Sequence, residues 1–195
     1  HITESGAKLC GIKEGDKIVL KDLLTVFLIY SGNDAGIAIA DHIAGSEQAF
    51  AELMNQKAKE IGAVDTHFVN SHGLHDENHY TTAYDIYLMF QQLVQYSELK
   101  DMIQMKSYQM NYINADGKDC QVTYSTTNQY LKGNLNPPDG ITVIGGKTGT
   151  TNAAGHCLTI LVNDSKGKEY VALVLKAEGS DSLYKQMNQL LSKIG

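Results

Sequence analysis

The sequence contains no arginine and no tryptophan, and it has two prolines in 195 residues. Its 16 basic residues are therefore all lysines, and against 22 acidic residues they leave a formal net charge of −6. An acidic chain without a basic stripe lacks the charge pattern that binds nucleic acid, so we expect no nucleic-acid partner. The longest mostly apolar stretch, residues 23–30, is too short to span a bilayer.

Cysteine is also scarce. Cys10, Cys120 and Cys157 lie far apart and are odd in number, which indicates neither a disulfide framework nor a metal cluster. We expect them to be buried free thiols. A hydrophobic fraction of 43% and a charged fraction of 19% are typical of an ordinary globular protein, so one domain with a real core is expected.

Hydrophobic periodicity predicts helices in the first half of the chain and strands in the second. The expected helices are 21–30, 34–44, 46–61, 82–94, 97–104 and a closing helix at 182–194. The expected strands are 107–113, 121–124, 141–148, 156–163 and 170–176. This order indicates an α+β fold with segregated lobes. For the helix at 46–61, Ser46 suits the N-cap and Gly62 suits the C-terminal end of the helix. The expected buried face of this helix comprises Phe50, Leu53, Met54, Ala58 and Ile61.

Two tripeptides carry groups suited to acyl transfer. Lys147-Thr148-Gly149 ends an apolar strand, and the glycines around it leave room for a substrate along the backbone. Ser31-Gly32-Asn33 lies in a turn between two helices, so both polar side chains can face one cleft. A serine, an amine that handles its proton and a strand that pairs with the substrate are the components of serine acyl transfer. Each tripeptide alone is a weak signal, because Ser-Gly-Asn also suits a plain turn.

The surroundings of these tripeptides resemble one family over nearly the whole chain. The matching segments are residues 23–35, 41–46, 66–80, 82–85, 127–131 and 146–158, and the loop at 66–80 is the most specific of them. In this order they resemble the D-alanyl-D-alanine carboxypeptidases, the low-molecular-mass penicillin-binding proteins of the serine peptidase S11 family. Penicillin-binding proteins carry S-x-x-K, Ser-x-Asn and K-T-G elements.

The resemblance implies a serine transpeptidase/β-lactamase-like fold and removal of the terminal D-alanine from peptidoglycan pentapeptides through an acyl-enzyme. Ser31 and Asn33 would shuttle protons and hydrogen-bond the substrate amide. Lys147 would position and polarise the substrate, Thr148 would bind its carboxylate, and Gly149 and Thr150 would complete the binding strand, with the Thr150 N–H in the oxyanion hole. β-Lactam antibiotics would be partners, no cofactor or metal is implied, and the location would be extracytoplasmic at the cell wall.

The chain departs from the family pattern in two ways. The family's nucleophile lies in an S-x-x-K helix upstream of the Ser-x-Asn turn, but upstream of Ser31 only Ser5-Gly6-Ala7-Lys8 fits, and it is a glycine-containing loop. We interpret this match as a chance occurrence of the S-x-x-K pattern, like the matches at 97–100, 165–168 and 182–185. The expectation is therefore an N-terminally truncated, inactive catalytic domain, with a mainly helical part and a hairpin at 1–135 and three antiparallel strands plus a helix at 136–195. The second departure is the missing arginine, which family members often place near the substrate carboxylate.

Three alternatives remain open. One is a β-lactamase of the same fold, and another is a non-catalytic module that binds peptidoglycan or β-lactams. A metal-dependent hydrolase is the distant third, because the loop at 66–80 holds His67, His72, His75 and His79 beside acidic residues. We favour the interpretation that these side chains hold the loop through hydrogen bonds. A sheet that lacked N-terminal strands would also expose an unpaired edge, which predicts an edge-strand dimer.

Overall fold

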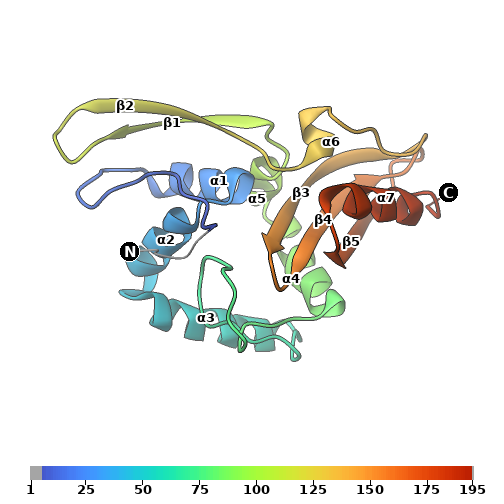
Figure 1. Ribbon diagram of the computed structural model, residues 1–195, viewed down its shortest axis with the longest axis horizontal. Coiled ribbons are helices and arrows are strands. Elements are labelled where there is room, and N and C mark those ends of the chain that lie inside the picture. Colours follow the sequence, from blue (N-terminus) through green and yellow to red (C-terminus); the bar gives the residue numbers. More distant parts are fainter. Residues whose placement is uncertain (1–5, 195) are drawn as a thin grey trace.

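The computed structural model describes residues 6–194, and it places a group of helices beside an antiparallel sheet (Figure 1). The helices in this part of the chain are α1 (Leu20–Tyr30), α2 (Asn33–Ala44), α3 (Glu47–Glu60), α4 (Ala83–Gln95), α5 (Ser97–Met102), α6 (Gln129–Lys132) and α7 (Ser180–Leu191). The strands are β1 (Ser107–Ile113), β2 (Asp119–Ser125), β3 (Thr142–Thr151), β4 (Gly155–Asn163) and β5 (Glu169–Ala177). The predicted elements are confirmed with small shifts at their ends, and the short helix α6 was missed.

The sheet that carries the Lys-Thr-Gly segment has the order β3-β4-β5, and all its pairings are antiparallel. One face packs on α7, where Ile160 meets Met187, and the other packs on α4, where Leu161 meets Phe90. The strands β1 and β2 form a separate hairpin that extends along α1 (Figure 1). The strand β3 lies at the edge of this sheet, and within the described residues it is paired on one side only, with β4.

The two glycines before Lys147 are needed by the fold itself. A Cβ atom at Gly146 would lie 2.3 Å from the Thr159 carbonyl oxygen, and one at Gly145 would lie 2.8 Å from the Ile103 carbonyl oxygen. The Gly146 N–H donates to that Ile103 carbonyl at 3.2 Å. The expectation that glycines leave room for a substrate is therefore wrong at these two positions, because neighbouring backbone takes the room.

Capping residues mark the boundaries of α3, as predicted, and of α4. The Ser46 Oγ accepts a hydrogen bond from the Ala49 N–H at 3.1 Å, and Gly62 adopts a φ of 86° just past the end of α3. The Thr82 Oγ1 accepts from the Asp85 N–H at 3.2 Å and opens α4. These local bonds satisfy N–H groups that have no partner inside the helix.

The predicted buried face of α3 is partly wrong. The buried side chains of this helix are Ala51 and Ala58, whereas Leu53 is 47% exposed. Phe50, Met54 and Ile61 are half-buried around an apolar hollow that residues outside the helix, including Met89, also line. Periodicity identified the apolar stripe but not how much of it the neighbouring elements cover.

Cys10, Cys120 and Cys157 are free thiols as predicted, although each is partly rather than fully buried. Burial and the nearby Asp34 carboxylate raise the pKa of the Cys10 thiol to about 12, which keeps it protonated and unreactive. Within residues 6–194, none of the helices has the length and apolar character needed to cross a membrane.

Candidate active site

A cleft of about 550 Å³ lies between the helical part and strand β3. It is lined by all six residues that the sequence predicts to be catalytic or substrate-binding: Ser31, Asn33, Lys147, Thr148, Gly149 and Thr150. The first two come from the turn between α1 and α2, and the other four come from β3. The tertiary structure therefore brings together two tripeptides that are more than a hundred residues apart in the chain.

Lys147 links the two walls of this cleft. Its Nζ donates a hydrogen bond to the Ser31 Oγ and another to the Thr148 carbonyl oxygen at 2.9 Å. Burial, and then the positive charge of Lys8, lower the pKa of the Lys147 ammonium to about 8. An amine with this pKa gives up and takes back a proton far more readily near neutral pH than an ordinary lysine.

Ser31 is held in an unusual backbone conformation. Its φ of 67° lies in the left-handed region, which non-glycine residues seldom adopt, and its N–H caps α1 by donating to the Phe27 carbonyl at 3.0 Å. Such strain is retained where the surrounding structure enforces it, and it is concentrated at functional sites. In this conformation the Ser31 hydroxyl accepts the hydrogen bond from Lys147.

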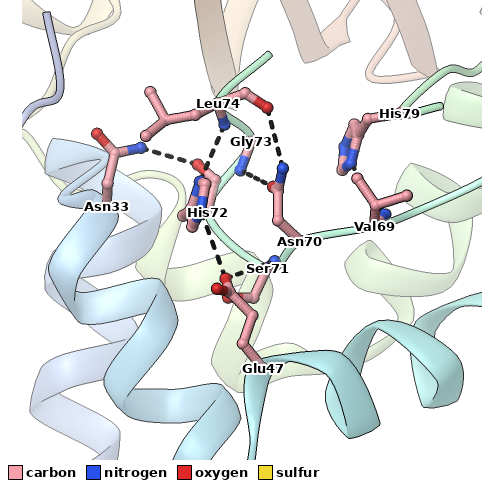
Figure 2. A network of polar contacts seen from close by, with 9 residues as sticks. All are labelled: Asn33, Glu47, Val69, Asn70, Ser71, His72, Gly73, Leu74 and His79. Carbon is pink, nitrogen blue, oxygen red and sulfur yellow. Dashed lines mark hydrogen bonds and ion pairs between the residues drawn. The ribbon is translucent and has the colours of Figure 1, made fainter. Parts of the chain in front are cut away.

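Asn33 is buried, and its carboxamide is fixed at both ends. The Oδ1 accepts a hydrogen bond from the Lys8 N–H at 2.7 Å, and the Nδ2 donates to the His72 carbonyl at 2.9 Å (Figure 2). A carboxamide has two acceptor sites and two donor hydrogens, so one of each remains for a ligand. The expected hydrogen bond from Asn33 to a substrate amide is compatible with this geometry.

The threonines of β3 face polar partners. Thr148 and Thr127 share a hydrogen bond between their Oγ1 atoms at 2.5 Å, and the Thr150 Oγ1 lies 3.5 Å from the His156 Nδ1. At Gly149 an added Cβ would find its nearest neighbour 3.9 Å away, so this stretch of backbone is open. Here the sequence-based expectation of an approachable strand agrees with the structure.

Lys8, which the sequence analysis set aside as part of a chance Ser-x-x-Lys match, also lines the cleft. Its Nζ lies 3.9 Å from the centroid of the Tyr30 ring, and burial together with the charge of Lys132 lowers its pKa. Lysines from distant parts of the chain therefore concentrate positive charge in the cleft of an acidic protein. A carboxylate ligand would be attracted to such a site. Ser5, the other end of the Ser-x-x-Lys pattern, lies outside the described residues.

Residues 66–80, hereafter the histidine loop, are held by hydrogen bonds to their histidine rings. The Val69 N–H donates to the His79 Nδ1 at 3.2 Å and the Leu74 N–H to the His72 Nδ1 at 3.1 Å (Figure 2). The His67 Nδ1 lies 2.6 Å from the Asn78 carbonyl oxygen. The predicted loop-holding role is confirmed for these three rings. Within residues 6–194, no three His, Cys, Asp or Glu side chains converge in a way that would hold a metal ion.

The comparisons with known proteins agree with one another. Residues 2–179 match the family described as D-alanyl-D-alanine carboxypeptidase, peptidase S11. The chain is 35% identical over 160 residues to the D-alanyl-D-alanine carboxypeptidase DacF of Bacillus subtilis, and this alignment covers 82% of the chain and 38% of that protein.

Solved structures show the same similarity in three dimensions. The D-alanyl-D-alanine carboxypeptidase DacD from Francisella tularensis has a TM-score of 0.81 at 29% identity, covering 97% of this chain and 55% of that one. The DD-transpeptidase of Streptomyces K15 has a TM-score of 0.83 at 25% identity, covering 96% and 71%. These matches confirm the predicted α+β fold of the serine penicillin-binding type. The chain spans 38% to 44% of the length of the first curated relatives it matches.

Proposed function

The chain belongs to the D-alanyl-D-alanine carboxypeptidase family, peptidase S11, and on that premise we propose that its cleft binds peptides ending in D-alanyl-D-alanine for serine acyl transfer. The observation that carries the proposal is the convergence of Ser31, Asn33 and Lys147 beside an open edge of β3. Peptidoglycan pentapeptides are the proposed substrates and β-lactams the proposed mimics. Peptidoglycan lies outside the cytoplasm, and we propose the same location for this protein.

In the proposed complex the peptide lies antiparallel to β3 beside Gly149, where the backbone is open. Its terminal carboxylate lies near the Thr148 hydroxyl and the cluster of lysine charges, and the Thr150 N–H faces the carbonyl that is attacked. Asn33 hydrogen-bonds the peptide amide through its remaining donor and acceptor. These interactions orient the terminal peptide bond and stabilise charge on its carbonyl oxygen.

The reaction of the family breaks the bond between the two D-alanines in two steps. A serine oxygen first bonds to the carbonyl carbon and D-alanine leaves with a proton on its nitrogen, and water then hydrolyses the ester. Lys147, with its pKa near 8, and Ser31 form a short proton path into the cleft. We assign them the role of moving that proton.

The attacking serine is not assigned to any residue of the chain. None of the serines at 97, 165 and 182 that begin an S-x-x-K pattern lines the cleft. We propose that residues 1–195 form one partial catalytic domain that supplies the binding and proton-transfer groups. By itself the chain is therefore expected to bind ligands without being acylated.

A fluorescent penicillin tests this assignment directly. After incubation and denaturing electrophoresis, the chain should carry no covalent label, while a peptide ending in D-alanyl-D-alanine should still shift NMR resonances of Thr148 and Gly149. An L-alanyl-L-alanine peptide is the control and should bind more weakly. A labelled band that disappears in Ser31→Ala or Ser5→Ala would overturn the assignment, and release of penicilloic acid would favour the β-lactamase alternative.

A non-catalytic binding module is the second candidate function. It is favoured by the same observation, namely that no S-x-x-K serine lines the cleft among the described residues. The coding sequence upstream of His1 separates the two candidates. A Ser-x-x-Lys helix encoded there would support the carboxypeptidase, and an upstream sequence without one would support the binding module.

A further inference from the structure

The middle of the histidine loop, residues 70–74, runs between the start of α2 and the start of α3 (Figure 2). On one side the His72 carbonyl accepts the hydrogen bond from the Asn33 Nδ2 at 2.9 Å. On the other side the loop contacts Glu47, the first residue of α3. His72 and Leu74 also line the cleft. The loop is thus the physical connection between Glu47 and a predicted site residue.

Glu47 holds the loop with one carboxylate oxygen. Its Oε1 accepts from the Ser71 N–H at 3.1 Å and from the Ser71 Oγ at 2.7 Å, and it lies 3.5 Å from the His72 Nε2. The side chains of Glu47 and His72 are 28% and 13% exposed. Hydrogen bonds to a charged acceptor at such a partly buried position are stronger than those between neutral groups.

The orientation of His72 is fixed by two contacts at opposite ends of its ring. The Nδ1 accepts from the Leu74 N–H at 3.1 Å, so the neutral ring carries its hydrogen on Nε2, which faces Glu47. Within the loop, the Asn70 side chain bridges the Gly73 N–H at 2.8 Å and the Leu74 carbonyl at 3.0 Å. The backbone carbonyl of His72 therefore has little freedom to turn away from Asn33.

The backbone of His72 packs closely against α2. A Cβ at Gly36 would lie 3.3 Å from the His72 Cα and 2.9 Å from the Phe27 ring. The loop lies directly on the helix that carries Asn33. A movement of residues 71–72 therefore changes the geometry of the hydrogen bond between the His72 carbonyl and the Asn33 side chain.

We propose that Glu47 is a positioning residue that acts through Ser71 and His72 to hold the Asn33 carboxamide in its ligand-binding orientation. Its effect on the ligand rests on the proposed function of the cleft, while its effect on Asn33 itself does not. Glu47 does not itself line the cleft, so sequence motifs around the site do not reveal it.

The test uses Glu47→Ala and Glu47→Gln, with Glu52→Ala as the matched control. Glu52 lies on the same helix and is exposed. The alanine variant removes the acceptor of both Ser71 bonds, whereas glutamine keeps a neutral acceptor oxygen. Both substitutions remove the negative charge from the start of α3, so a difference between them reports the acceptor and not the helix dipole.

The first readout is the side-chain amide NMR signal of Asn33 in the protein without ligand. It should shift and broaden in Glu47→Ala and keep its wild-type position in Glu47→Gln and in the control. The second readout is the affinity for an acetylated dipeptide of D-alanine, which should fall about tenfold in Glu47→Ala, the equivalent of one well-placed hydrogen bond, and be restored by glutamine.

An unchanged Asn33 signal in folded Glu47→Ala would overturn the proposal. So would an equal loss of affinity in Glu47→Gln, because that would implicate the charge alone. If the wild-type chain does not bind the dipeptide, the proposed function of the cleft fails, and the Asn33 signal still decides the role of Glu47. Ser71→Ala provides a second variant, with a smaller shift expected because the Ser71 N–H bond to Glu47 remains.

Discussion

Lys147 lies at the contact between the two walls of the cleft, and its environment is costly for an ammonium group. Burial lowers its pKa to about 8, so the folded protein binds this proton less tightly than the unfolded chain. A structure selected for stability alone would not keep such a residue there. The cost is understandable if the amine is needed to exchange protons with Ser31 and to attract an anionic ligand.

Replacement of Lys147 by methionine should make the protein more stable at pH 7. Methionine fills a similar volume without a charge, and we expect the free energy of unfolding to rise by about 1–3 kcal/mol. Binding of the D-alanyl-D-alanine peptide should fall at the same time. Urea unfolding of Lys147→Met beside the exposed control Lys59→Met measures the effect, and a loss of stability would contradict the prediction.

The same residue predicts how stability depends on pH. Below pH 8 Lys147 is protonated in both states and destabilises the fold, while above its ordinary value of 10.5 it is neutral in both states. Between these values the unfolded chain binds more protons, so the stability of the wild type rises with pH relative to that of Lys147→Met. Unfolding measured at intervals over this range should show the gap between the two proteins closing, and a constant gap would refute the assigned shift.

At the scale of single elements, β3 and α2 show how local sequence is adapted to close neighbours. In β3, Gly145 and Gly146 are required by adjacent backbone, while Gly149 faces open space. In α2, the Asp34 carboxylate accepts from the N–H groups of Cys10, Gly11 and Ile12 at 2.8 to 3.3 Å and so docks the incoming segment beside Ser31. The three glycines of β3 thus look alike in sequence but differ in role, and Asp34 links α2 to the chain before α1.

Alanine substitution distinguishes the structural role of Gly146 from the ligand-binding role that we propose for Gly149. Gly146→Ala should prevent folding or lower the melting temperature sharply, because its Cβ would lie 2.3 Å from a carbonyl oxygen. Gly149→Ala should melt like the wild type but bind the peptide more weakly, since the added methyl group lies where we place the peptide backbone. Thermal unfolding and NMR titration of both variants check this. Wild-type affinity in Gly149→Ala would show that the peptide lies elsewhere.

Loss of the Asp34 carboxylate should release the segment before α1. Asp34→Ala leaves three N–H groups without their acceptor, and we expect a cost of about 2–3 kcal/mol in the free energy of unfolding. Hydrogen exchange at Cys10 and Ile12 should accelerate. Asp41→Ala, an exposed carboxylate on the same helix, is the control and should change neither quantity.

At the scale of the whole molecule, the sheet has two edges within the described residues, and their surroundings differ. The edge of β3 borders the cleft, and the edge of β5 carries the apolar run from Val171 to Leu175. Strands at an edge are often protected by charges, and the run from Val171 to Leu175 carries none, although the register between β4 and β5 shifts near its end. We propose that the β5 edge pairs with a second copy of the chain.

Light scattering over a concentration series tests that pairing. The expected result is a mass that rises from that of a monomer toward that of a dimer as the protein is concentrated. The peptide should leave this equilibrium unchanged, because its binding strand lies at the opposite edge of the sheet. A monomer at every soluble concentration would contradict the proposal.

Much of the fold followed from sequence because its signals are local. The predicted cap Ser46 and the predicted helix start at Thr82 are both confirmed, and each side chain bonds the backbone three positions later. The exposure of Leu53 was missed because it depends on what lies opposite α3, and one apolar stripe does not specify that. The helix α6 was missed because four residues contain too little periodicity to detect.

The sequence by itself determined the chemistry that is available: two tripeptides with a hydroxyl, a carboxamide and an amine, a chain without arginine, and an order of motifs that matches one family. The tertiary structure decided which of these groups meet. Only the folded chain brings Lys147 to Ser31, adds Lys8 to the cleft and connects Glu47 to Asn33 through the histidine loop. The physical reason is that desolvation and hydrogen-bond geometry depend on contacts between distant segments, which no spacing along the chain encodes.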